Sequence, residues 1–281
     1  MIGNKTLGIL IILLMINFGK LHSQELVIDE LQRIQYLIQM ENFEKAIEFS
    51  KKLDDSLFCE KNELLGFSYK NIGNYSLAIN HYKTYIEQCN PSYIQRINLG
   101  DAYFKIDSLD SAEKQFKEVI KSNPKMGLAY FNIGQIEYIR NNKKEAADFY
   151  LKAVNNTGST LNFDYVEMMI QTLIDLKDYE KAIKFSDEVI GMWEQNTNEY
   201  KYSEILKAMI YGEMGEYEKA IKNIDDIIAT QIEHPAILLE AYSNKLRFFD
   251  KLKDKNKACL EYDKIKNIDP NAPILKKYDC K

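Results

Sequence analysis

Four cysteines carry the most distinctive chemistry of this chain: Cys59, Cys89, Cys259 and Cys280. Four cysteines can form two disulfides in three different pairings. No two of them form a Cys-x-x-Cys motif, so the spacing argues against redox catalysis and against covalent haem attachment. We therefore treat them as structural bridges, whose pairing depends on the elements that carry them.

The remaining residue types give no metal-binding or catalytic pattern. The histidines His22, His81 and His234 are widely separated, and the chain has no His-x-x-x-His or cysteine–histidine cluster. It also lacks a Gly-x-Ser-x-Gly element, a Walker phosphate loop and a Gly-x-Gly-x-x-Gly element. The sequence therefore predicts a protein that is not an enzyme and that uses no cofactor and no metal.

Two further features resemble chemical motifs only superficially. The segment 212–215 is glycine-rich, and we assign it to the turn between two helices. The acidic pairs Asp54-Asp55 and Asp225-Asp226 could suggest acid–base catalysis. Adjacent helical residues diverge by about 100°, however, which favours solvated helix surface.

The overall composition indicates a helical globular protein. Of the 281 residues, 46% are hydrophobic and 28% are charged, which excludes a disordered chain. A net charge of −5 argues against nucleic acid as the partner. Only 12 glycines and 5 prolines predict long helices with few loops.

The N-terminal segment 1–23 has the features of a secretory signal peptide. Lys5 precedes an apolar run over 7–18, and the small residue Ser23 stands at the expected cleavage site. The run is shorter than the roughly 20 residues that span a bilayer, although an uncleaved membrane anchor is the alternative. We expect an exported chain, periplasmic or secreted, with no transmembrane span after residue 23.

The rest of the chain repeats one unit. Similar six-residue segments occur at 42–47, 74–79, 178–183 and 216–221, and weaker copies occur elsewhere in the chain. The copies centre on alanines spaced 32 to 38 residues apart: Ala46, Ala78, Ala112, Ala146, Ala182, Ala220 and Ala258. Fixed-period similarity predicts a repeat architecture, in which each unit buries its apolar face against its neighbours.

The pattern of the repeat unit predicts two helices in close contact. A small residue precedes the alanine by twelve positions in four repeats: Gly66, Gly100, Gly134 and Ala208. Glycine is costly inside a helix, so its recurrence there indicates close helix packing. Polar turns separate the two helices, and aromatic residues such as Tyr82 and Phe116 follow the alanine by four positions, on the same helical face.

This pattern resembles the tetratricopeptide repeat, a 34-residue pair of antiparallel helices. The segments Leu65–Tyr82 and Leu99–Pro124 carry the resemblance, which covers residues 27–270. It implies an all-α, right-handed solenoid of about seven hairpins with a C-terminal capping helix, forming one domain over 24–281. A Sel1-like repeat is the alternative, but its glycine-rich connecting loop is missing.

The hairpin arrangement favours one pairing of the cysteines. Cys59 begins the first helix of the second repeat and Cys89 ends its second helix, so an antiparallel hairpin brings them together. Cys259 and Cys280 are nearly equidistant from the break at Pro270, so a returning tail would pair them. In the alternative, Cys259 is a small core residue.

The resemblance also implies a binding groove lined by the first helix of each repeat. The groove positions of repeats 2 to 4 are Glu63, Phe67, Lys70, Ile97, Asp101, Phe104, Phe131, Gln135 and Tyr138. This mixture would suit an apolar or amphipathic peptide. The alternative is that several of these side chains pack between adjacent repeats. The Lys-x-x-x-Asn pair with which some members clamp a terminal carboxylate is absent.

We therefore predict a non-enzymatic scaffold or adaptor of the cell envelope or secreted space, which binds a protein or peptide in its groove. The alternative is an accessory solenoid that recognises a glycan or peptidoglycan by stacking on groove aromatics. A catalytic subunit is disfavoured. The sequence does not determine the oligomeric state.

Overall fold

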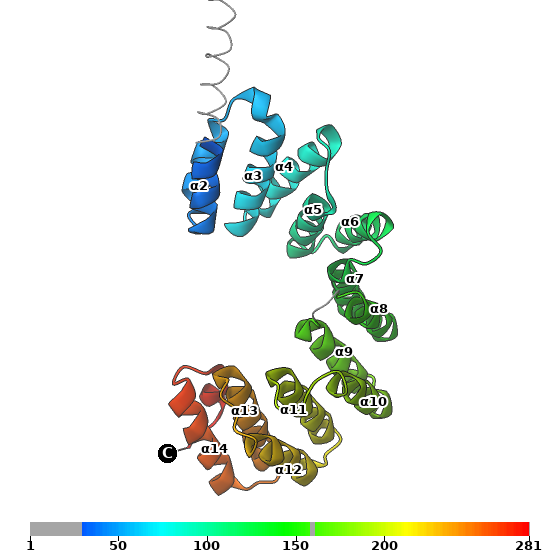
Figure 1. Ribbon diagram of the computed structural model, residues 1–281, viewed down its shortest axis with the longest axis vertical. Coiled ribbons are helices and arrows are strands. Elements are labelled where there is room, and N and C mark those ends of the chain that lie inside the picture. Colours follow the sequence, from blue (N-terminus) through cyan, green and yellow to red (C-terminus); the bar gives the residue numbers. More distant parts are fainter. Residues whose placement is uncertain (1–29, 158–160, 281) are drawn as a thin grey trace, which may run out of the picture. The chain divides into compact units, whose positions relative to one another are not determined.

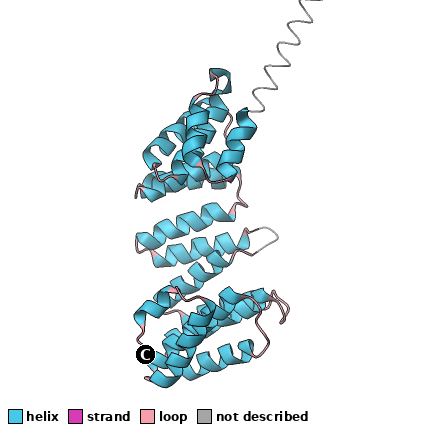
Figure 2. Ribbon diagram, turned by 90° about the vertical axis from the view of Figure 1, so that its left-hand side faces the viewer, coloured by secondary structure: helices cyan, strands magenta, loops and turns pink. Residues whose placement is uncertain are grey.

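The computed structural model describes residues 30–157 and 161–280, and all regular elements in this part of the chain are helices (Figure 2). The predicted signal peptide, residues 1–23, lies outside the described residues. Residues 30–39 are helical and are followed by α2 (Phe43–Lys51), α3 (Phe58–Asn71), α4 (Tyr75–Gln88), α5 (Tyr93–Lys105), α6 (Leu109–Ser122), α7 (Gly127–Ile139), α8 (Lys143–Asn155), α9 (Phe163–Asp175), α10 (Tyr179–Ile190), α11 (Asn198–Glu213), α12 (Tyr217–Ile228), α13 (Pro235–Lys251) and α14 (Lys255–Ile268). The predicted all-α fold is confirmed.

Consecutive helices pair as hairpins (Figure 1). The first helices are 30–39, α3, α5, α7, α9, α11 and α13, and each is followed by its partner, from α2 to α14. Each recurrent alanine lies on a second helix and is at most 4% exposed. The connections 191–197 and 229–234 fall where the wider repeat spacing predicts insertions, although 52–57, which contains the short 3-10 helix η1 (Asp55–Leu57), is as long as the second of them.

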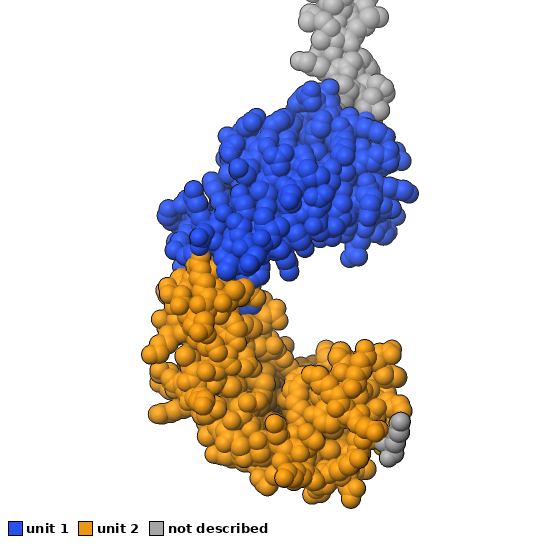
Figure 3. All heavy atoms as spheres, turned by 180° about the vertical axis from the view of Figure 1, so that it is seen from behind, with its two compact units in different colours: residues 1–132 blue, residues 133–281 orange. Residues whose placement is uncertain are grey.

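The chain divides into two compact units, one ending at Asn132 and the other beginning at Ile133 (Figure 3). The boundary lies within α7, so the fourth hairpin contributes to both units. Each unit contains successive hairpins of the same construction. The single domain expected over 24–281 stays a prediction.

The turn inside each hairpin has a common backbone construction. A residue with positive φ stands five positions before each recurrent alanine: Glu41, Gly73, Asp107, Asn141, Lys177, Gly215 and Lys253. In the second hairpin, the amide of Gly73 donates to the Lys70 carbonyl at 3.1 Å, and that of Asn74 donates to the Tyr69 carbonyl at 2.9 Å. This is the Schellman ending of a helix. The Asn74 side chain then accepts from the Leu77 amide and caps α4, so one short turn ends the first helix and begins the second.

The first and second helices touch where a glycine faces an aromatic ring. A Cβ added at Gly66 would lie 3.0 Å from the Tyr82 ring, and one added at Gly100 would lie 2.6 Å from the Phe116 ring. Both rings are fully buried. The predicted reason for the recurrent glycine is therefore present: the ring occupies the space that a side chain would need.

Segment 212–215 differs from the single turn assigned to it above. Gly215, with φ +84°, forms the turn, but Gly212 is buried in the last turn of α11. A Cβ on Gly212 would collide with the ring of Phe248 on α13. Gly212 therefore makes room for an aromatic side chain of the next hairpin.

The C-terminal segment does not form the predicted capping α-helix. Instead of an α-helix, it forms the short 3-10 helix η2 (Pro273–Lys277), preceded by the buried Ala272 and containing the buried Leu275. The disulfide Cys259–Cys280 joins this tail to α14, and Cys59–Cys89 joins the ends of α3 and α4. The structure thus contains both of the favoured pairings.

We expect Gly100→Ala to destabilise the protein by about 2 kcal/mol, because the new methyl group must displace the fully buried Phe116 ring. Gly66→Ala should cost less, since its ring lies farther away. Adding Phe116→Leu to Gly100→Ala should cost less than Phe116→Leu costs alone. Urea unfolding of the four variants measures this coupling, and additive effects would contradict the proposed contact.

We expect the double variant Cys59→Ser/Cys89→Ser to lose about 3–4 kcal/mol of stability, because the bridge closes a loop with a sequence separation of 30. Urea unfolding with and without a reducing agent measures the loss, and peptide mapping of the unreduced protein identifies both bridges. If the reducing agent left the wild-type transition unchanged, the bridges would not stabilise the fold.

Candidate partner-binding surface

The nine groove residues predicted from the sequence all lie on first helices. In the first unit, α3 carries Glu63, Phe67 and Lys70, α5 carries Ile97, Asp101 and Phe104, and α7 carries Phe131; in the second unit, α7 carries Gln135 and Tyr138. Ile97 is buried and the other eight are half-buried. Their assignment to a partner-binding groove stays a prediction, and the contacts of each side chain determine what it can offer.

In the first unit, polar side chains join each first helix to the next. Lys70 Nζ donates to Asn98 Oδ1 at 2.5 Å and lies 3.8 Å from Asp101 Oδ2. Asn132 Nδ2 on α7 donates to Asp101 Oδ1 at 3.1 Å. Burial raises the pKa of the Asp101 carboxyl and lowers the pKa of the Lys70 ammonium. Their mutual attraction and, for Asp101, the hydrogen bond from Asn132 oppose this effect of burial without reversing it.

The other candidates of α3 are also engaged. Glu63 Oε1 accepts from Gln95 Nε2 at 2.5 Å, and Gln95 also caps the start of α5 with Ser92. The ring of Phe67 packs edge-on against Phe43 of the preceding hairpin, with centroids 6.3 Å apart. The alternative raised by the sequence therefore applies here: several groove positions pack between repeats.

In the second unit, Tyr138 is part of a polar cluster around Asp175 of α9. The Tyr138 hydroxyl donates to Asp175 Oδ2, Lys143 Nζ donates to the same oxygen at 3.0 Å, and Gln171 Nε2 donates to Oδ1 at 3.1 Å. Burial raises the pKa of Asp175, but these three donors outweigh it and hold the pKa below its usual value. Tyr138 therefore ties α7 to α9. Gln135 makes no hydrogen bond within the described residues.

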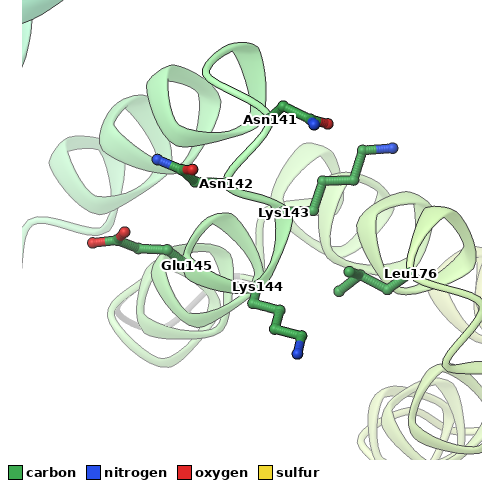
Figure 4. A pocket seen from close by; sticks show the side chains of 6 residues that line it. All are labelled: Asn141, Asn142, Lys143, Lys144, Glu145 and Leu176. Carbon is green, nitrogen blue, oxygen red and sulfur yellow. The ribbon is translucent and has the colours of Figure 1, made fainter.

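A pocket of about 610 Å³ lies beside this cluster (Figure 4). Its lining comes from the turn of the fourth hairpin, the start of α8 and the end of α9: Asn141, Asn142, Lys143, Lys144, Glu145 and Leu176. None of these is a predicted groove residue, so the pocket lies at the turn edge of the hairpin rather than among the groove candidates.

An aromatic cluster in the second unit was not predicted. Phe163 stacks with Trp193 at 6.3 Å between centroids and meets Tyr202 edge-on at 5.2 Å. The Tyr202 hydroxyl donates to Glu167 Oε1, which joins α11 to α9. The repeat register could have found Tyr202, because it precedes the small residue Ala208 by six positions, a groove position. Trp193 lies in an insertion, where the register gives no information.

Two exposed apolar side chains were also missed. Ile94 is 51% exposed and Leu128 is 38% exposed. Each precedes a recurrent glycine, Gly100 or Gly134, by six residues, so both occupy one groove position on successive first helices. They are free to contact a partner, whereas many of the predicted residues are held by other repeats.

Within residues 30–157 and 161–280, no group of three or more His, Cys, Asp or Glu is arranged to hold a metal ion. In the same part of the chain, no helix combines the length and the apolar character needed to cross a bilayer.

These features define a helical-repeat protein, built from successive helical hairpins. Two segments of the chain match tetratricopeptide repeat models: residues 97–159 match one model and residues 205–229 match another. Neither model describes a catalytic family. No curated protein gives a significant sequence match.

Solved structures share this fold at low sequence identity. The C-terminal part of a TPR repeat-containing protein from Cytophaga hutchinsonii is 17% identical, with a TM-score of 0.62, and the match covers 88% of this chain and 98% of that one. A tetratricopeptide repeat protein from Parabacteroides merdae is 13% identical, with a TM-score of 0.62 and coverage of 89% and 96%. The pilF protein of Pseudomonas aeruginosa is 16% identical, with a TM-score of 0.52 and coverage of 79% and 96%.

We expect Asp175→Asn to cost about 2 kcal/mol near neutral pH, because three donors lose a charged acceptor. The pKa of Asp175 is lowered in the folded state, so its stabilisation is present above the unfolded pKa and is lost as pH falls through the folded value. Urea unfolding from pH 7 to pH 2 should therefore bring wild type and variant together in acid. A constant difference across this range would contradict the assignment.

Proposed function

We propose that this chain is a non-enzymatic scaffold or adaptor that binds a protein or peptide on the faces of its first helices. The observation that carries the proposal is the exposure of Ile94 and Leu128 at one repeat position of successive first helices. Apolar side chains that recur in register across neighbouring repeats form a continuous surface, which a partner can cover. Phe104 and Phe131 lie half-buried on the same two helices.

We further propose that the protein acts outside the cytoplasm, in the cell envelope or secreted space. Two observations support this location: the N-terminal sequence has the pattern of a signal peptide, and all four cysteines are paired as disulfides. Disulfides persist in oxidising compartments and are rare in the cytosol.

A photocrosslinking amino acid tests the binding face. We would introduce it at Gln135, which lies on a first helix, and separately at Lys83, an exposed residue on the second helix α4. In the native cell, we expect a discrete partner to be crosslinked at Gln135 and none at Lys83. Mass spectrometry would identify the partner crosslinked at Gln135. Crosslinking from Lys83 alone would contradict the proposed face.

Glycan recognition is the second candidate, and the cluster of Phe163, Trp193 and Tyr202 favours it. Sugars stack on aromatic rings, and Glu167 beside Tyr202 supplies a hydrogen-bond acceptor. Trp193 is the only tryptophan, so its fluorescence reports on this cluster alone. A saturable fluorescence change with peptidoglycan fragments, combined with no crosslinked protein at Gln135, would favour this candidate over the scaffold.

A further inference from the structure

The first helices of the first unit carry an apolar surface whose members are held in register. Ile94 on α5 and Leu128 on α7 occupy the same repeat position, and the Asn132–Asp101 hydrogen bond joins the two helices. Phe104 and Phe131 are half-buried on these helices. Covering such a surface with an apolar segment would be favourable by about 25 cal/mol for each Å² removed from water.

An acidic edge borders this surface on α3. Glu60 is exposed and Glu63 is half-buried, and residues three apart lie on one face of a helix. The Glu63–Gln95 hydrogen bond links α3 to α5. Glu60 precedes Gly66 by six residues, so it occupies on α3 the repeat position that Ile94 occupies on α5 and Leu128 on α7. The acidic edge and the apolar surface are therefore adjacent and form one site on α3, α5 and α7 of the first unit.

The two carboxylates of this edge have no cationic partner within the described residues. Glu63 is held by the Gln95 amide, which leaves its charge uncompensated. The nearest basic residues of α3 are occupied elsewhere: Lys61 contacts the Leu53 carbonyl and Asp55, and Lys70 contacts Asn98 and Asp101. A ligand can therefore supply the missing positive charge.

We propose that this surface, defined by Glu60, Glu63, Ile94 and Leu128, binds a peptide segment of a partner protein in which lysine or arginine residues stand next to an apolar run. The basic side chains meet the two glutamates, while the apolar run covers the aliphatic pair. This inference rests on the proposed function and specifies the chemistry of the partner.

Three synthetic peptides test the inference on the full-length protein. The first is a fluorescent, end-blocked decapeptide with two lysines followed by leucine, phenylalanine and isoleucine residues. The second has glutamates in place of the lysines, and the third has serines in place of the apolar residues. Fluorescence anisotropy at about 50 mM salt, where charges are weakly screened, measures each affinity.

We expect the lysine peptide to bind about fivefold more tightly than the glutamate peptide, which corresponds to two ion pairs of modest strength. Glu60→Gln/Glu63→Gln should abolish this preference, whereas Glu180→Gln/Glu188→Gln, which changes two exposed glutamates of α10, should leave it intact. Ile94→Ser/Leu128→Ser should weaken binding of both apolar peptides, and the serine peptide should not bind measurably.

Equal affinity for the lysine and glutamate peptides, or a preference that survives Glu60→Gln/Glu63→Gln, would overturn the inference. If crosslinking at Gln135 still captured a partner, the proposed function would stand and only the partner chemistry would be wrong. Self-association of the wild type that Ile94→Ser/Leu128→Ser abolishes would assign the surface to a second copy of the chain, and this result would also overturn the inference.

Discussion

The close approach of an aromatic ring on the second helix to a glycine on the first is the contact on which the second and third hairpins depend. Phe116 lies so near Gly100 that even one methyl group would collide with it, and Tyr82 has the same relation to Gly66. This contact fixes the separation of the two helices. Ala78 and Ala112 stand one helical turn before Tyr82 and Phe116. The same contact therefore also explains why these two alanines are fully buried.

Because the two helices of a hairpin lie so close together, the chain must reverse its direction within a short turn. A residue with positive φ and a pair of backbone hydrogen bonds to the first helix provide this reversal in every described hairpin turn, yet only Gly73 and Gly215 among the positive-φ residues of these turns are glycines. The sequence indicates polar turns, but it does not indicate that Glu41, Lys177 and Lys253 adopt the left-handed conformation. This conformation accompanies their backbone hydrogen bonds to the preceding helix, which form the Schellman ending.

The difference between local sequence information and contacts between repeats also explains how much of the candidate surface could be predicted from the sequence. The repeat register correctly assigns Glu63, Asp101 and Tyr138 to first helices, because that information is local. It does not reveal that Asp101 binds Lys70 and Asn132, or that Tyr138 binds Asp175, because these bonds join different repeats. Polar groups of this kind must be satisfied when half-buried, so they are committed to holding neighbouring hairpins together. Ile94 and Leu128, which have no such commitment, are the better candidates for binding.

The central claim is that a partner covers the first helices and leaves the second helices exposed. Methyl NMR of the protein with its crosslinked partner or the lysine peptide tests this directly, because exposed aliphatic side chains occur on both kinds of helix. We expect the signals of Ile94 and Leu128 to shift on binding, while those of Leu77 on α4 and Leu260 on α14, which are 39% and 61% exposed, stay in place. Shifts confined to Leu77 and Leu260 would contradict the account.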